Sequence, residues 1–184
     1  MLAYVFWHRP GAGVDPAAYE RSLAGFHRSL ADDPPLGFRR SVWHRVGHLP
    51  WLWSGPAFED WYLVDGWPEI GALESGAVTG SRRAPHDGVA GSAVDGAGAV
   101  YGLVTGPEDA LDGGRRAWFG RPSGLTYAQL DEALADAIPA AAAVWRRRLV
   151  LGPAPEHCVA GASPGVLPAD LDAVESAGSR PATE

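Results

Sequence analysis

The stretch that most restricts the fold runs from residue 36 to residue 67. It consists of two strand-like runs, residues 38–46 and 58–64, on either side of a loop rich in proline, glycine and tryptophan, and it holds five of the eight tryptophans. Successive side chains of a strand point to opposite faces, and here both faces carry aromatic and charged residues. This mixture predicts a sheet with one face packed on helices and the other lining a semi-polar cavity.

The alternation also groups the chemically active side chains of these two runs. Arg40 and His44 share one face of the first run, whereas Trp43 lies on the opposite face. Asp60 and Tyr62 share a face of the second run, about 7 Å apart. A carboxylate and a phenol so placed could orient a substrate or relay a proton, or Asp60 could simply pair with an arginine of the neighbouring strand.

Regular elements are predicted before this stretch. Residues 2–8 are rich in β-branched and aromatic side chains and indicate a strand. Asp15 is a good N-cap for a helix with Pro16 at its first position, and the prolines that follow Asp33 end it. The buried stripe of this helix is predicted to comprise Tyr19, Leu23, Phe26 and Leu30.

After the stretch, Trp67 opens a second helix, residues 81–87 are predicted to form a loop, and residues 99–104 indicate a fourth strand. The order over residues 1–106 is therefore β-α-β-β-α-β. This is the arrangement of a ferredoxin-like domain, which belongs to the α+β class.

A weaker copy of the beginning follows in the second half. Residues 116–124 resemble residues 3–11, and the two Arg-Pro pairs lie 121 − 9 = 112 residues apart. Thr126 is an N-cap for another helix, which Pro139 is predicted to end or kink, although residues 140–145 could resume it.

Only one short closing strand, residues 156–159, is predicted in this half. Residues 107–161 are thus interpreted as a partial second repeat packed on the first. Residues 162–184 are rich in serine, proline, glycine, alanine and acids, which predicts a mostly disordered tail.

With these features the chain resembles the dimeric α+β barrel superfamily, in which ferredoxin-like sheets face each other across a barrel. The resemblance rests on the element order, on the aromatic first and third strands (residues 4–7 and 61–64) and on the partial second copy. It implies an α+β barrel. Similar proteins include cofactor-free monooxygenases of antibiotic biosynthesis, polyketide cyclases, EthD-like proteins, muconolactone isomerases, haem-degrading enzymes and chlorite dismutases. No motif matches one member closely, so no catalytic set is transferred.

Composition narrows the expected partners. A net charge of −7 argues against a nucleic-acid surface. The single cysteine, Cys158, fits a reducing cytoplasm, and no apolar run reaches the ~20 residues that span a bilayer. We expect a cytoplasmic protein that binds a small apolar or aromatic molecule, with no nucleic acid, no membrane and a possible homodimer.

Three histidines are candidates for chemistry, each with a plainer interpretation. His8 could be an acid or base at a barrel mouth, or a strand-end residue bonded to a loop. His44 could face the barrel interior or be a satisfied core residue. In haem-binding relatives an axial histidine comes from a region broadly similar to that of His86, which could instead cap its loop with Asp87. The predicted catalytic set is His8, His44, Asp60, Tyr62 and His86, and the predicted substrate-binding set is Trp7, Arg40, Trp43, Trp51 and Trp53.

Three functions follow as hypotheses. The first is an enzyme without a cofactor (an oxygenase, cyclase or isomerase) that acts on a small apolar or aromatic substrate in a barrel pocket. There, Tyr62 and at least one of His8 and His44 would line one cavity, closed by Trp51 or Trp53. The second is a haem protein with His86 as axial ligand. The third is a non-catalytic binding or assembly module whose tryptophan-rich loop forms a dimer surface.

Overall fold

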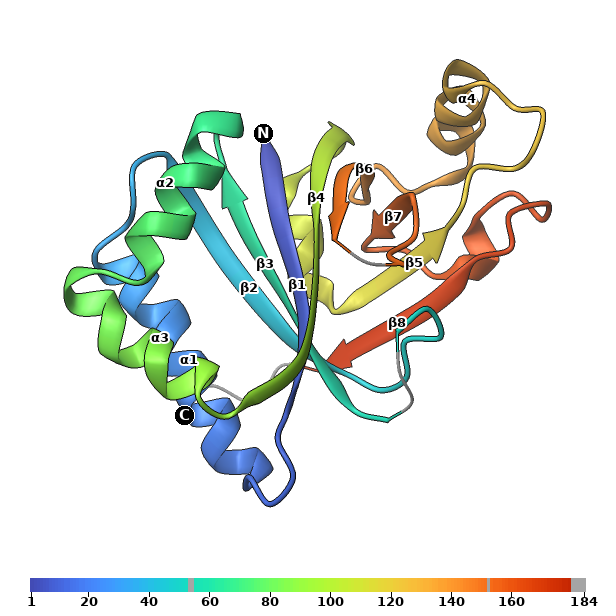
Figure 1. Cartoon of the computed structure of the whole chain (residues 1–184). Helices are drawn as coiled ribbons and strands as arrows, with labels where there is room; N and C mark the ends of the chain where they lie inside the picture. The colour runs from blue at the N-terminus through green and yellow to red at the C-terminus, as the bar shows by residue number, and fades with distance from the viewer. Residues whose placement is uncertain (53–54, 152, 180–184) are drawn as a thin grey trace.

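The computed structural model describes residues 1–52, 55–151 and 153–179 (Figure 1). It is a mixed α+β fold built on one eight-stranded antiparallel sheet that closes into a barrel in the order β1-β3-β2-β8-β5-β7-β6-β4. The strands are β1 (Leu2–Pro10), β2 (Phe38–Val46), β3 (Ala57–Val64), β4 (Ala93–Thr105), β5 (Arg115–Phe119), β6 (Ala143–Leu151), β7 (His157–Ala160) and β8 (Val174–Ser179). The helices are α1 (Pro16–Asp32), α2 (Trp67–Ala77), α3 (Arg83–Ala90) and α4 (Tyr127–Ala137), with short 3-10 turns η1 (Gly80–Arg82), η2 (Glu108–Gly113) and η3 (Pro164–Val166).

The two halves of the barrel have the same strand order. The first half is β4-β1-β3-β2 and the second is β8-β5-β7-β6, so each runs fourth, first, third, second. The halves join along two seams, a long one between β4 and β6 and a short one between β2 and β8. Figure 1 shows α1, α2 and α3 together beside the first half, while α4 lies beside the second.

The prediction of a mostly disordered tail over residues 162–184 is wrong up to Ser179. β8 pairs with both β2 and β5, and it is the fourth strand of the second half. Leu167 and Leu171 are buried in a hydrophobic layer with α4. The apolar residues of this segment are few and irregularly spaced, so no periodic pattern reveals them. They are buried only because the rest of the second half forms the hydrophobic layer against which they pack. Residues 180–184 lie outside the described part of the chain.

Matching positions in the two halves are separated by a different offset from that of the Arg-Pro pairs in the sequence. Trp7 and Trp118 hold equivalent places, since they lie opposite Glu59 and Cys158 in matching strand pairs. Their separation is 118 − 7 = 111 residues, one less than that of the Arg-Pro pairs. The helix caps, Asp15 and Thr126, are likewise 126 − 15 = 111 apart.

The strongest local signals are confirmed. The side chain of Asp15 accepts hydrogen bonds from the first turn of α1, and Pro16 begins that helix. Thr126 forms a full capping box with Gln129 at the start of α4.

Two other predicted elements are wrong. The loop expected over residues 81–87 is η1 followed by α3, which tolerates Pro85 because a proline in the first turn removes no helical hydrogen bond. The helix that was predicted to end or kink at Pro139 does end just before it, since α4 stops at Ala137. The alternative that it resumes over residues 140–145 is wrong, because β6 begins at Ala143 and pairs with β4 and β7.

The barrel interior is a packed core. The buried tryptophans Trp7, Trp61, Trp118 and Trp145 fill it, together with small residues from the facing strands. At its centre Glu59 accepts hydrogen bonds from Trp7 Nε1 (3.0 Å) and Trp61 Nε1 (2.8 Å) and forms an ion pair with Arg116. These side chains occupy the space where a substrate pocket was expected.

Candidate functional site

A cavity of about 500 Å³ lies on the other side of the sheet, between the outer face of the first half and helices α1, α2 and α3. Its buried members include His8 and Asp60, whereas Glu74, Val78 and Leu149 are exposed and mark its opening. A volume of this size suits a small organic ligand. The residues that line it are Tyr4, Phe6, His8, Phe26, Asp60, Tyr62, Ile70, Leu73, Glu74, Ala77, Val78, His86, Val89, Ala90, Ala93, Val100 and Leu149.

Aromatic rings from β1 cover the neighbouring strand β4 along one wall. A Cβ atom added at Gly98 would lie 2.8 Å from the Tyr4 hydroxyl oxygen, and one added at Gly96 would lie 2.6 Å from Phe6 Cζ. The glycines therefore leave the space that the ring tips occupy. The rings of Tyr4 and Phe6 are 23° from parallel, and those of Tyr4 and Tyr62 are 22° from parallel. This wall is aromatic because β4 is glycine-rich.

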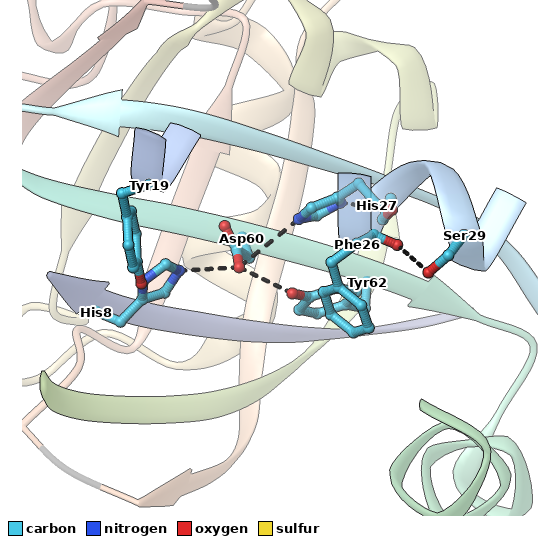
Figure 2. A network of polar contacts seen from close by, with 8 residues as sticks. His8, Tyr19, Phe26, His27, Ser29, Asp60 and Tyr62 are labelled. Carbon is cyan, nitrogen blue, oxygen red and sulfur yellow. Dashed lines mark hydrogen bonds and ion pairs between the residues drawn. The ribbon is translucent and has the colours of Figure 1, made fainter. Parts of the chain in front are cut away.

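The polar end of the cavity is organised by Asp60 on β3 (Figure 2). Its Oδ2 atom accepts a hydrogen bond from the Tyr62 hydroxyl at 2.8 Å and lies 3.0 Å from His8 Nε2. His27, on α1, places its Nε2 atom 3.7 Å from the same oxygen. On the far side of His8, Nδ1 is 2.5 Å from the hydroxyl of Tyr19. Two strands and a helix thus converge on one buried carboxylate.

The proton positions follow from this geometry. If His8 donates through Nε2 to the carboxylate, its Nδ1 accepts from the Tyr19 hydroxyl. Tyr19, His8 and Asp60 then form a chain in which the carboxylate fixes the tautomer and orientation of the imidazole. Among the described residues, the other carboxylate oxygen, Asp60 Oδ1, is buried without a hydrogen-bond partner.

The electrostatics keep Asp60 ionised and the phenols neutral. Burial alone would raise the pKa of Asp60, but His8 and His27 outweigh it and lower that pKa below the ordinary aspartate value. Burial, reinforced by the charge of Asp60, raises the pKa of Tyr62 well above 10 and also raises that of Tyr4. The site therefore presents a fixed negative charge beside hydroxyl groups that stay protonated.

His86 lies on the helical side of the cavity. It is on α3, not in a loop, and the edge of its ring packs against Phe26 with centroids 5.5 Å apart. Its Nδ1 atom is 3.1 Å from the carboxylate of Asp87. This contact is the local pairing of the plainer interpretation, and it orients the ring of a histidine that also lines the cavity.

The structure brings together four of the ten predicted site residues. His8, Asp60, Tyr62 and His86 line one cavity. The alternative pairing of Asp60 with an arginine of β2 does not occur, because Arg39 and Arg45 form ion pairs with other carboxylates.

The other predicted residues lie elsewhere. His44 is buried, with Nε2 3.0 Å from the carbonyl oxygen of Leu111, and Arg40 forms an ion pair with Asp112. Trp7 is inside the barrel, and Trp43 is half-buried against Phe58.

The tryptophan-rich loop does not close the cavity in the described part of the chain. Trp51 packs on Trp7 and Trp118, with ring centroids 6.3 and 5.4 Å away, and so covers the barrel core. Trp53 lies outside the described residues.

Sequence reasoning missed three members of the site. His27 follows Phe26 and lies four residues after Leu23, so the helical spacing could have predicted a histidine on the apolar face of α1. Tyr19 was assigned only to the core. Tyr4 could not be found because its place over Gly98 depends on the pairing of β1 with β4.

In the described part of the chain, no three histidine, cysteine, aspartate or glutamate side chains are grouped to hold a metal ion. Among the described helices, none is both long and apolar enough to cross a lipid bilayer. No protein-family model matches the sequence, and no curated protein matches it.

Proposed function

We propose that this chain is an enzyme without a cofactor that moves a proton on a small apolar or aromatic substrate held between the sheet and helices α1 to α3. The observation that carries the proposal is the His8–Asp60–Tyr62 cluster at the buried end of an otherwise apolar cavity. Reactions that begin in this way include isomerisation, cyclisation and oxygenation of an activated carbon acid. A buried, ionised carboxylate has a high free-energy cost unless its partners are fixed, and here they are fixed beside an apolar space.

Each polar residue of the cavity has a separate role in the proposed proton transfer. Both ring nitrogens of His8 already have partners, so His8 and Tyr62 hold Asp60 in place through its Oδ2 atom. The carboxylate takes the proton from the substrate at Oδ1, which has no hydrogen-bond partner among the described residues. Tyr62 already donates its hydroxyl proton to Asp60, so the donor to a substrate oxygen on which charge develops is Tyr4, whose pKa burial raises. The hydroxyl of Tyr4 lies on the aromatic wall of the cavity, over Gly98. The apolar walls exclude water, which strengthens each of these interactions.

The strand order supports a wider proposal about ancestry. Each half is arranged as in a ferredoxin-like unit, and equivalent positions lie 111 residues apart. We therefore propose a single-chain form of the dimeric α+β barrel, with two complete units in place of one and a partial copy.

Proton exchange tests the function without knowledge of the full reaction. 2-Tetralone, an apolar aromatic ketone with acidic C–H bonds, would be incubated with the protein in D2O and followed by proton NMR. We expect the wild type to accelerate loss of the C1 proton signal, and Tyr62→Phe and His8→Gln to lose most of that acceleration. His44→Gln, a change outside the cavity, is the matched control. A wild type that binds the ketone but leaves its exchange rate unchanged contradicts the proposal.

A haem protein is the second candidate, because His86 lines the cavity and its Nδ1 contact with Asp87 orients the ring as metal-bound histidines usually require. Bound haem would supply redox chemistry at the iron. The described lining set contains no arginine or lysine to pair with the haem propionates, so the fit is incomplete. Titration with haem should give a Soret band that His86→Ala abolishes or shifts. A protein that takes up no haem excludes this candidate.

An assembly module is the third candidate, and the packing of Trp51 over the barrel core removes part of its support. If the loop nevertheless forms a dimer surface, Trp51→Ala should weaken dimerisation in analytical ultracentrifugation. An unchanged sedimentation profile would exclude this role for Trp51.

A further inference from the structure

Apart from histidines, the charged side chains among the described lining residues have one sign. Asp60 at the buried end and Glu74 at the opening are carboxylates, and the described lining residues include no arginine. The basic side chains among the described lining residues are His8 and His86, and each already contacts a carboxylate, that of Asp60 or Asp87. No arginine or lysine among the described lining residues offsets the carboxylates at the two ends of the cavity.

Each of these carboxylates has at least one oxygen atom without a hydrogen-bond or ion-pair partner among the described residues. Asp60 concentrates its contacts on Oδ2, while Oδ1 is buried and has no hydrogen-bond partner among the described residues. Glu74 is on the exposed face of α2 and forms no ion pair in the described part of the chain. Several other exposed acids are paired, such as Asp33 with Arg82.

The walls between these carboxylates favour positive charge as well. Rings from Tyr4, Phe6, Phe26 and Tyr62 line the cavity. The face of an aromatic ring carries a negative quadrupole that attracts cations, most strongly where water is excluded.

From this combination we propose that the cavity selects an organic cation: a small aromatic or apolar amine whose ammonium group lies between the aromatic walls and a carboxylate. The inference rests on the proposed function, because it names the substrate class of the same cavity. It also predicts what the cavity rejects. A carboxylate or phosphate ester would enter a site of like charge with no arginine to neutralise it.

Three ligands with one carbon skeleton test the charge preference. 4-Phenylbutylamine, 4-phenylbutan-1-ol and 4-phenylbutanoate would be titrated into the full chain by calorimetry at pH 8. We expect the amine to bind tightest and the acid weakest, with the amine about tenfold or more tighter than the acid because charge interactions are strong in a partly buried site. The amine affinity alone should fall as salt is added.

A pair of matched variants locates the effect. Glu74→Gln removes the charge at the opening without disturbing the core, since this residue is exposed. It should weaken amine binding about two- to fivefold, the range of an exposed ion pair, and leave the alcohol unaffected. Glu132→Gln makes the same charge change on α4, which lies beside the other half of the barrel. It should change the binding affinity of neither the amine nor the alcohol.

The outcomes distinguish the cation preference from the small-molecule cavity itself. If the alcohol or the acid binds as tightly as the amine, the cavity accepts apolar ligands but the cation preference is overturned, while the proposed function stands. If Glu132→Gln weakens amine binding as much as Glu74→Gln does, only net charge is at work and the assignment of Glu74 is overturned. If none of the three ligands binds, both the cation preference and the small-molecule cavity are contradicted.

Discussion

At the scale of single residues, Asp60 sets the character of the site. An ionised carboxylate beneath a helix is expensive to bury unless its charge is paired. His8, His27 and Tyr62 supply that pairing from three elements, all at one oxygen atom. The same contacts that stabilise the charge therefore fix the geometry of the groups around it.

This linkage gives a pH dependence with a definite sign. Because the folded pKa of Asp60 is lowered, the unfolded chain binds a proton more readily, and stability rises with pH in that region. The contribution is fully present above the unfolded aspartate pKa of about 3.9 and is lost as pH falls through the lower folded value. Asp60→Asn should cost about 3 kcal/mol near pH 7, and its deficit relative to wild type should shrink below about pH 4. Urea unfolding at a series of pH values measures both quantities, and a deficit that is constant down to pH 2 would contradict the assignment.

Tyr62 and His44 should respond in opposite ways to substitution. Tyr62→Phe removes one donor to Asp60, so it should cost about 1 kcal/mol of stability but reduce proton exchange on a bound ketone about tenfold or more. His44→Gln disturbs a buried contact with Leu111. It should lower the melting temperature and leave exchange per folded molecule unchanged. Equal effects of both variants on exchange would show that the cavity does not define the site.

At the scale of elements, the sequence predicted those with strong local chemistry. The N-caps Asp15 of α1 and Thr126 of α4 and the strand face shared by Asp60 and Tyr62 all depend on neighbours in sequence, and all are confirmed. β6 and β8 have little local signal, because their place depends on partners far along the chain. The predicted location of the cavity, inside the barrel, was wrong for the same reason. Faces could be grouped from alternation, but which face meets the helices is decided by packing.

The last strand should therefore matter to stability. Deleting residues 166–184 removes β8, two buried leucines and the hydrogen bond from Trp118 Nε1 to Ser176 Oγ (2.8 Å). We expect the melting temperature to fall by more than about 10 °C, since each kcal/mol shifts it by roughly 2–4 °C in a domain of this size. Leu171→Ala is a milder test and should cost about 2–3 kcal/mol. Scanning calorimetry would measure both, and a deletion that melts like the full chain would show that β8 contributes nothing.

At the scale of the whole molecule, a buried ion pair joins the halves. Glu59 belongs to the first half and Arg116 to the second, and both side chains are fully buried among the tryptophans of the core. Such a pair adds little net stability compared with an apolar replacement, but it penalises any arrangement that separates its members.

A double-mutant cycle measures this connection. Arg116→Met alone leaves a buried carboxylate without its cation and should cost about 3–5 kcal/mol. Adding Glu59→Gln should recover a substantial part of that loss, because no uncompensated charge remains. Chemical denaturation of the two single variants and the double variant gives the coupling. Strictly additive losses would indicate that the two side chains do not interact.

Among the described residues, the Asp60 network has no counterpart at the matching positions of the second half. Where β1 and β3 place Phe6 opposite Asp60, β5 and β7 place Ala117 opposite Val159. A barrel assembled from two identical subunits must present its site twice. Here one chain closes the barrel by itself, and its second half completes the barrel without carrying the Asp60 network. The expected stoichiometry is therefore one ligand per chain, with a simple hyperbolic titration, and dilution should leave the activity of each molecule unchanged.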